Sequence, residues 1–180
     1  ISCSSVAASS SAALPGAVFV AVRGVSADGH AFVADAFSRG AVAAVVEDAS
    51  ALGGRPGIVV SNARLALSRV ASLMYAEPSR DLTCIGITGT NGKTTTNWIV
   101  YHVLNRIGGG CQRIGTLGSE VMGRNTEVGA LTSPDPISVH RMLYEARRLG
   151  AKNSVLETSS HALDQARVED VEFDVGVFSN

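Results

Sequence analysis

The fold is decided by the stretch Gly86-Ile87-Thr88-Gly89-Thr90-Asn91-Gly92-Lys93-Thr94-Thr95-Thr96. It lies between residues 82–88, whose apolar run predicts a β-strand, and residues 93–107, which predict a helix. Glycines allow backbone N–H groups to converge on phosphate oxygens, and the N-terminus of a helix adds a favourable dipole. The stretch therefore predicts a loop that binds the phosphates of ATP.

Lys93 and Thr94 carry the chemistry of this loop. The Lys93 ammonium can reach the β- and γ-phosphates, and the Thr94 hydroxyl is placed to ligate Mg²⁺. The strict pattern G-x-x-x-x-G-K-[ST] requires glycine where this chain has Ile87, so the match is to a variant loop. The alternative is a strand-to-helix turn that binds nothing, but Gly-Lys-Thr in this context has no evident packing purpose. The residues expected to bind ATP are Gly89, Thr90, Asn91, Gly92, Lys93, Thr94 and Thr95.

On the C-terminal side of the loop, strand and helix patterns continue to alternate. Further strands are expected at residues 114–117, 153–157 and 173–178, and a helix is expected to begin at Pro136 and to end at Gly150. Residues 118–130 are Gly-rich and polar and predict a hairpin or a loop. Alternation of this kind is typical of an α/β fold with a mostly parallel sheet.

The N-terminal side shows the same alternation in a smaller unit. Strands are expected at residues 17–22, 42–46 and 57–60, with a helix at residues 30–38 between the first two. A second helix is capped by Asn62 and closed by Pro78, and its apolar stripe is expected to include Leu65, Val70, Leu73 and Met74. Residues 1–16 are rich in serine and alanine and are expected to form a low-complexity tail. Because the alternation restarts after residues 77–81, we expect one domain at residues 1–80 and a second at residues 81–180.

The composition excludes several classes of protein. Hydrophobic residues make up 46% of the chain and the mean hydropathy is +0.21, so the chain can form a packed core. The net charge of -1 provides no overall field to attract nucleic acid or an acidic membrane. No apolar run approaches the ~18 residues of a transmembrane helix. Three cysteines without a Cys-x-x-Cys spacing argue against a disulfide framework and a zinc site, and favour a reducing compartment such as the cytoplasm.

Glu157 is a second candidate for the nucleotide site. It ends a predicted strand, and ligands of open parallel sheets bind beyond the carboxyl ends of strands, where the phosphate loop also falls. A carboxylate at this place can hold Mg²⁺. A helix cap formed by Ser159, with Glu157 incidental, explains the same residues equally well. Residues 132–136 likewise fit a capping turn, and Arg167 either pairs with an anion or is solvated.

Together these residues resemble the Mur ligase family of bacterial cell-wall synthesis, and within it the enzymes that add the third residue of the peptide. Four stretches carry the resemblance in family order: Leu14-Pro15-Gly16-Ala17-Val18-Phe19-Val20-Ala21 with Asp28-Gly29-His30; the phosphate loop; residues 131–136; and Glu157-Thr158-Ser159-Ser160-His161-Ala162-Leu163 through Arg167 to Asn180. The family commonly has Asp-Ser-Arg where this chain has Ser9-Ser10-Ser11, so only the middle serine is kept.

The resemblance implies three domains: a UDP-binding N-terminal domain, a central ATPase domain and a C-terminal domain that receives the amino acid. Residues 1–80 would be the first of these and residues 81–180 the front part of the second, so the chain is expected to be a piece of a longer protein. The implied reaction is ATP-dependent amide ligation. The γ-phosphate of ATP activates a carboxylate of UDP-N-acetylmuramoyl-L-Ala-D-Glu as an acyl phosphate, and the amine of meso-diaminopimelate or L-lysine displaces the phosphate.

The resemblance also implies roles for single residues. Lys93 and Glu157 would be catalytic, and Thr94 and Glu157 would hold Mg²⁺. The residues that would contact the UDP-muramoyl-dipeptide are Ala8, Ser10, Thr132, Ser133, Ser159, Gln165 and Arg167. The family's later metal-binding His, its carbamylated Lys and its C-terminal domain have no counterpart within these 180 residues, so the piece alone is expected not to catalyse ligation.

Two alternatives stay open. A cyanophycin synthetase or folylpolyglutamate synthetase shares the phosphate loop, but lacks this N-terminal arrangement. A non-catalytic nucleotide-binding or scaffold protein could keep the fold, but the presence of Lys93, Thr94 and Glu157 together weighs against it. The expected form is a monomer without nucleic-acid or membrane partners.

Overall fold

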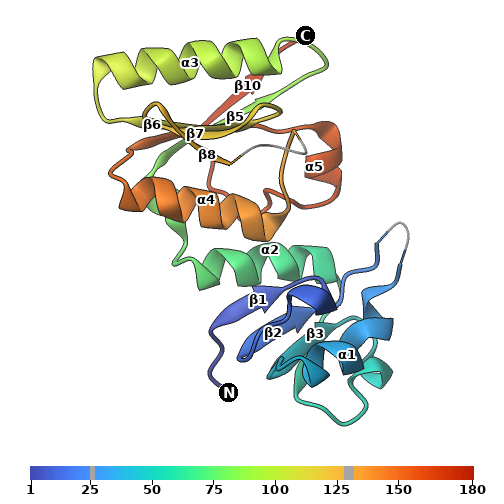
Figure 1. The fold of residues 1–180 in the computed structure, drawn as a ribbon. Coiled ribbons are helices and arrows are strands. Elements are labelled where there is room, and N and C mark those ends of the chain that lie inside the picture. The colour runs from blue at the N-terminus through green and yellow to red at the C-terminus, as the bar shows by residue number, and fades with distance from the viewer. Residues whose placement is uncertain (25–26, 128–131) are drawn as a thin grey trace. The chain divides into compact units, whose positions relative to one another are not determined.

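The computed structural model describes residues 1–24, 27–127 and 132–180. The chain divides between Met74 and Tyr75 into two compact units, each of which is described by itself (Figure 1). Among the described residues, no helix is long and apolar enough to cross a membrane. Cys3, Cys84 and Cys111 are free thiols, and burial raises the pKa of Cys84 and of Cys111 to about 12.

The first unit is built on a four-stranded sheet in which every neighbouring pair is parallel. The strands follow the chain in the order β1 (Ser5–Ala7), β2 (Ala17–Val20), β3 (Ala43–Val46) and β4 (Gly57–Val59). The connections carry α1 (Val33–Ser38) and short 3₁₀ turns at Ser10–Ala12, Gly29–Phe32 and Ala49–Leu52, and α2 (Ala63–Met74) follows the last strand. The prediction of a tail at residues 1–16 was wrong, because Ser5–Ala7 pair in register with Ala17–Phe19. Ladder hydrogen bonds come from the backbone, so the serine-rich composition does not prevent them.

The buried face of α2 also differs from the prediction. Leu65 and Leu73 are 43% and 54% exposed, whereas Ala63, Leu67 and Ala71 are buried together with two serines. Small residues let the helix approach a sheet that is itself rich in alanine. The predicted cap is confirmed, since Asn62 Oδ1 accepts hydrogen bonds from the N–H groups of Arg64 and Leu65.

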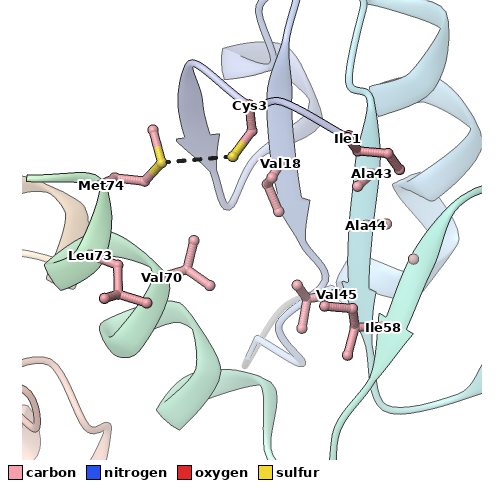
Figure 2. A pocket seen from close by; sticks show the side chains of 11 residues that line it. Ile1, Cys3, Val18, Ala43, Ala44, Val45, Ile58, Val70, Leu73 and Met74 are labelled. Atoms are coloured by element: carbon pink, nitrogen blue, oxygen red, sulfur yellow. Dashed lines mark hydrogen bonds between the residues drawn. The ribbon is translucent and has the colours of Figure 1, made fainter.

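An apolar pocket of about 370 Å³ lies between α2 and the strands of the first unit (Figure 2). Val70, Leu73 and Met74 line it from α2, and Cys3 Sγ lies 4.0 Å from Met74 Sδ at one side. The residues that line it from the strands are Val18, Ala43, Ala44, Val45, Gly57 and Ile58. None of the residues expected to bind nucleotide or substrate lines this pocket.

The second unit contains a six-stranded sheet in the order β10-β5-β9-β6-β7-β8. The strands are β5 (Thr83–Thr88), β6 (Cys111–Gly115), β7 (Gly118–Val121), β8 (Arg124–Glu127), β9 (Asn153–Glu157) and β10 (Val175–Phe178). The first four strands in that order are parallel, and β7 and β8 are antiparallel. The expectation of an α/β fold with mostly parallel sheets is confirmed.

Two helices cover opposite faces of this sheet (Figure 1). Helix α3 (Lys93–Ile107) packs Trp98, Tyr101 and Leu104 against Ile85, Ile87 and Val155. Helix α4 (Pro136–Arg148) packs Val139, Met142, Leu143 and Ala146 against Cys84, Ile114 and Leu156. Successive residues of β5 and β9 therefore serve alternate cores, as the twofold period of a strand requires. A short helix, α5 (Ser160–Asp164), and a 3₁₀ turn, Pro78–Asp81, complete the unit.

Most element predictions in the second unit are confirmed, but β6 and β10 begin at other residues than predicted, β10 at Val175 rather than at residue 173. The helices at residues 93–107 and from Pro136 are present, and residues 118–127 form the hairpin β7–β8. Residues 128–130 of that prediction lie outside the described residues. Strand β6 begins at Cys111 rather than at residue 114, because Cys111 pairs with Asn153 and its side chain is fully buried.

The side chain of His140 on α4 is fully buried, and in the described part of the chain neither ring nitrogen has a hydrogen-bond partner. Burial lowers the pKa of His140 to about 4, because the charged imidazolium would lose its hydration. The pKa of the same side chain in the unfolded chain is near 6.5. Between about pH 4 and pH 6.5 the unfolded chain therefore binds a proton that the folded chain does not.

We predict that this proton makes the protein less stable in mild acid. The stability that the neutral imidazole supplies is complete above pH 6.5 and is lost as the pH falls toward 4. Between pH 7.5 and pH 5 the free energy of unfolding should fall by about 2 kcal/mol. Urea unfolding across this range measures the change. His140→Leu should flatten the dependence, whereas His161→Asn, at an exposed position, should leave it unchanged. An equally steep curve for His140→Leu would contradict the prediction.

Candidate functional site

The phosphate loop connects the end of β5 at Thr88 to the start of α3 at Lys93. Gly89 and Gly92 have φ values of 131° and 84°, which side chains of L-residues rarely adopt. A Cβ atom on Gly89 would also collide with the carbonyl oxygen of Ser179. Glycine at this position is therefore required both by the backbone conformation and by the close approach of another segment.

The end of β10 holds this loop in place. The Thr90 and Asn91 N–H groups donate to the carbonyl oxygen of Asn180 over 2.7 and 3.0 Å. The Ser179 hydroxyl lies 2.7 Å from the Asn91 carbonyl oxygen and 3.0 Å from that of Thr88. Sequence reasoning missed Ser179 and Asn180. The available signal was that a predicted parallel strand ends directly before them.

A pocket of about 350 Å³ opens beside the loop and carries positive charge. The Lys93 ammonium donates to the carbonyl oxygens of Gly89, at 2.5 Å, and of Thr90, at 3.1 Å. Helix α3 has Gly92 as its N-cap residue and no side-chain cap, whereas α2, α4 and α5 are capped by Asn62, Asp135 and Ser159. The first-turn N–H groups of α3 and the ammonium are groups of the kind that bind anions in proteins. The lining residues are Thr88, Gly89, Thr90, Lys93, Ser159, Ser160 and Phe178.

Glu157 lies next to this loop because β9 pairs with β5. Ile87 and Glu157 are partners in the ladder, so the strand ends, and the loop with them, come to one edge of the sheet. The Glu157 side chain is buried, and its Oε2 accepts hydrogen bonds from the hydroxyls of Thr94, at 3.0 Å, and of Thr116, at 3.1 Å. Gly115 leaves the space for the carboxylate, since a Cβ there would overlap it.

The oxygens of Thr94 and Glu157 suit Mg²⁺. Mg²⁺ prefers oxygen ligands at about 2.1 Å in an octahedron, whose neighbouring corners lie about 3 Å apart, as these two oxygens do. Within the described residues no group of three or more His, Cys, Asp or Glu side chains could hold a metal ion. A cation held by Thr94 and Glu157 would therefore take its other ligands from phosphate oxygens and water.

Four of the predicted substrate residues gather around Ser133. The Ser133 hydroxyl donates to the main-chain carbonyl oxygen of Glu157 over 2.9 Å and accepts from the N–H of Ser159 over 3.1 Å. The Arg167 guanidinium donates to the Ser133 carbonyl oxygen over 2.7 Å and to Gln165 Oε1 over 2.7 Å. Arg167 is therefore hydrogen-bonded to two neutral oxygen atoms of the protein, rather than paired with an anion or solvated.

Thr132 joins the same cluster through its hydroxyl, which lies 3.1 Å from that of Thr116. Ser159 also caps α5, since its Oγ accepts a hydrogen bond from the Ala162 N–H over 3.2 Å. The cap predicted at Ser159 is therefore confirmed, and the role of Glu157 in the site stays a prediction. Asp135 caps α4 next to Ser133, in agreement with the capping turn predicted for residues 132–136.

In the first unit, Ala8 and Ser10 line a pocket of about 380 Å³. Phe19, Val22, Gly24, Ala27, Gly29 and Phe32 are among its other lining residues. The Ser10 hydroxyl forms a hydrogen bond with the Asp35 carboxyl. This bond is the main cause that lowers the pKa of Asp35 below its usual value. The two residues expected near the uridine therefore share one pocket.

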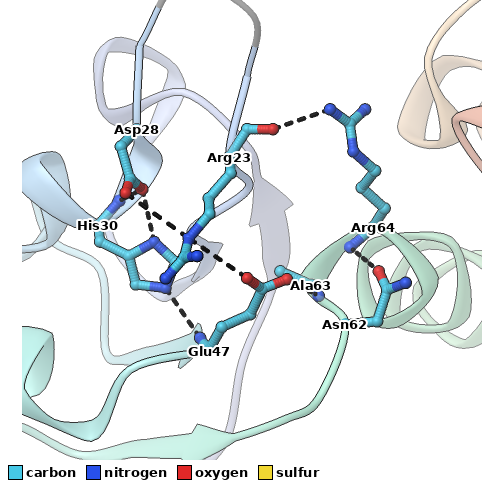
Figure 3. A network of polar contacts seen from close by, with 7 residues as sticks. All are labelled: Arg23, Asp28, His30, Glu47, Asn62, Ala63 and Arg64. Atoms are coloured by element: carbon cyan, nitrogen blue, oxygen red, sulfur yellow. Dashed lines mark hydrogen bonds and ion pairs between the residues drawn. The ribbon is translucent and has the colours of Figure 1, made fainter.

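A polar network links residues that lie next to this pocket (Figure 3). The imidazole of His30 accepts from the Glu47 N–H at Nε2, over 2.8 Å, so its proton is on Nδ1, which lies 2.6 Å from Asp28 Oδ1. Glu47 in turn accepts from the Ala63 N–H at the start of α2, and its carboxylate lies 3.4 Å from the Arg23 guanidinium. The network therefore links Arg23 and Asp28 to Glu47, which directly follows β3, and through Glu47 to the start of α2.

Comparison with known families agrees with both halves of the chain. Residues 3–75 match the profile of the "Mur ligase family, catalytic domain", and residues 87–180 match that of the "Mur ligase middle domain". The UDP-N-acetylmuramoyl-L-alanyl-D-glutamate--2,6-diaminopimelate ligase of Pseudomonas putida is 43% identical over 170 residues. That match covers 92% of this chain and 34% of the relative, so the chain spans about a third of the relative's length.

Solved structures share the fold. A UDP-N-acetylmuramoyl-L-alanyl-D-glutamate--2,6-diaminopimelate ligase is similar with a TM-score of 0.83 and 24% identity, over 99% of this chain and 36% of that one. A MurF ligase from Thermotoga maritima, solved in complex with ADP, is similar with a TM-score of 0.62 and 26% identity, over 96% of this chain and 36% of that one.

The space around the Glu157 carboxylate yields a prediction for Gly115. Gly115→Ala should lower the free energy of unfolding by about 1–3 kcal/mol, because the added methyl group must displace the buried carboxylate. Gly176→Ala in β10 is the matched control, since nothing lies within 4 Å of its added Cβ, and it should change stability by no more than about 0.5 kcal/mol. Denaturant unfolding measures the free energy of unfolding of both variants. Equal stabilities would mean that Glu157 does not fill this space.

Proposed function

Because this chain belongs to the Mur ligase family, we propose that it is the UDP-binding and front ATP-binding part of an ATP-dependent amide ligase. The proposed reaction adds the third amino acid to UDP-N-acetylmuramoyl-L-Ala-D-Glu. One observation carries the proposal: the buried Glu157 carboxylate, the Thr94 hydroxyl and the Lys93 loop meet at one edge of a parallel sheet. A protein that only kept the fold has no need of this charged arrangement.

ATP binding is supported by the loop itself. The Lys93 ammonium and the uncapped N-terminus of α3 supply the positive charge that a triphosphate requires. We propose that Thr94 and Glu157 hold Mg²⁺, which when bound neutralises charge on the phosphate oxygens. A related MurF ligase was solved with ADP, which is the product expected of such a reaction.

The chain's own residues position reactants rather than form covalent bonds to them. The dipeptide carboxylate attacks the γ-phosphorus of ATP, ADP leaves, and an acyl phosphate forms. The amine of the incoming amino acid then displaces inorganic phosphate, loses a proton and forms the amide. Lys93 stabilises the charge on the transferred phosphoryl group, and the cluster around Ser133 orients the muramoyl-dipeptide.

The substrate assignment rests on the two clusters of predicted residues. We propose that the uridine occupies the pocket lined by Ala8 and Ser10 in the first unit. We assign Thr132, Ser133, Ser159, Gln165 and Arg167 to the muramoyl-dipeptide. The names of the relatives support diaminopimelate over lysine as the added amino acid.

The proposed phosphate site yields a prediction for ATP binding. Lys93→Ala should weaken binding of Mg²⁺·ATP by about 10- to 100-fold, because a charge-assisted contact to phosphate is lost. Lys152→Ala is the matched control. This substitution removes the only other lysine, which is exposed and lies directly before β9, at the end of the strand opposite Glu157. The Lys152→Ala variant should bind Mg²⁺·ATP as the wild type does. Isothermal titration calorimetry measures both. Equal affinities for the two variants would argue against a working phosphate site.

The second prediction concerns the reaction. The natural full-length protein should incorporate labelled meso-diaminopimelate into the nucleotide-linked product when supplied with Mg²⁺, ATP and UDP-N-acetylmuramoyl-L-Ala-D-Glu. L-lysine should be incorporated much less, and the 180-residue chain alone should incorporate neither. Absence of incorporation with ATP binding intact would favour the scaffold alternative, and turnover by the 180-residue chain would contradict the expectation that it is incomplete.

A further inference from the structure

Thr116 lies at the centre of a short line of hydroxyl groups that ends on Glu157. Its Oγ1 is 3.1 Å from Glu157 Oε2 and 3.1 Å from the Thr132 hydroxyl. A hydroxyl has one proton, and a carboxylate can only accept. The Thr116 hydroxyl is placed to donate both to Glu157 Oε2 and to the Thr132 hydroxyl. The carboxylate is the charged and therefore the stronger acceptor of its single proton.

The backbone around Thr116 makes this arrangement firm. Gly115 and Gly118 are partners in the β6–β7 ladder, so Thr116 and Leu117 form a two-residue turn. The absence of a side chain at Gly115 brings the Glu157 carboxylate against the strand end, within reach of the next residue. The turn therefore delivers a hydroxyl to one fixed point beside the carboxylate.

Glu157 is held at its other end by the neighbour of Thr132. Ser133 donates to the Glu157 main-chain carbonyl oxygen over 2.9 Å. The segment that carries two of the proposed substrate residues thus contacts Glu157 twice, once directly and once through Thr116. Thr94, the third partner, comes from the phosphate loop. Of the two hydroxyls on Oε2, only that of Thr116 comes from outside the loop that binds the nucleotide.

We propose that Thr116 is a positioning residue that orients the Glu157 carboxylate for Mg²⁺. This inference rests on the proposed function, because it assumes that Glu157 binds the cation that accompanies ATP. Groups that hydrogen-bond to metal ligands fix the direction of the ligand's lone pairs, and their loss typically costs 10- to 100-fold in metal affinity.

The test is a titration of Mg²⁺ into the 180-residue chain with a fluorescent ATP analogue. Thr116→Val keeps the shape of the side chain and removes its hydroxyl. It should raise the Mg²⁺ concentration needed for half-maximal binding by about 10-fold. Binding of the analogue in EDTA should not change, since Lys93 and the loop are untouched. Thr116→Ser, which restores the hydroxyl, should return the half-point to within about 2-fold of the wild type.

A matched control is Thr126→Val on β8, which removes a hydroxyl hydrogen bond to the Ser119 carbonyl oxygen away from Glu157. It should leave the Mg²⁺ half-point unchanged. A Thr116→Val half-point equal to that of the wild type, or an equal loss of binding with and without Mg²⁺, would overturn the proposal. A shifted half-point in a protein whose full-length form ligates no amino acid would keep Thr116 as a positioning residue and reject the ligase. Absence of Mg²⁺-dependent binding by the wild type would overturn both.

Discussion

Ile87 of β5 pairs with Glu157 of β9, and the rest of the second unit depends on this register. The pairing puts the last residue of β9 beside the first turn of the loop that follows Thr88. Since β6 and β10 run parallel to the same two strands, their carboxyl ends bring Thr116 and Ser179 to the same edge. Four segments far apart in the sequence thus converge on a single carboxylate and a single loop. A slip of one residue would turn Glu157 to the opposite face of the sheet.

Helix α2 of the first unit and helix α3 of the second unit begin in opposite ways. In the first unit, Glu47 and Asn62 bond to the first N–H groups of α2, so that helix has no free positive end. In the second unit, α3 follows a glycine and has no side-chain cap. The difference lies in a few residues just before each helix, and it separates a structural helix from one that can receive phosphate.

The parts that sequence predicted best are those whose cause is local. The phosphate loop, the helix Lys93–Ile107 and the caps Asn62 and Asp135 depend on residues within a few positions of one another, so a short pattern contains the whole reason for them. Thr116 and Ser179 were missed because their partners lie 41 and about 90 residues away.

Other errors had the same origin. The serine-rich strand Ser5–Ala7 is a strand only because β2 offers it a ladder, and Leu65 and Leu73 are exposed because smaller residues on α2 fit the sheet better. A sequence pattern reports what a segment prefers, and these segments are decided by what lies opposite them. The edge of the sheet still carried the main functional prediction, since Glu157 and the loop were both expected there.

The strand order also determines when each unit can be completed during synthesis. In the first unit each strand pairs with the one made just before it, so the sheet can grow as the chain leaves the ribosome. In the second unit β5 has no neighbour until β9 is made, 70 residues later at the Ile87–Glu157 pair, which takes about 4–14 s at ~5–20 residues per second. During that interval Ile85 and Ile87 have no strand on either side, so the strand that later supports the phosphate loop lacks the ladder that orders it in the finished sheet.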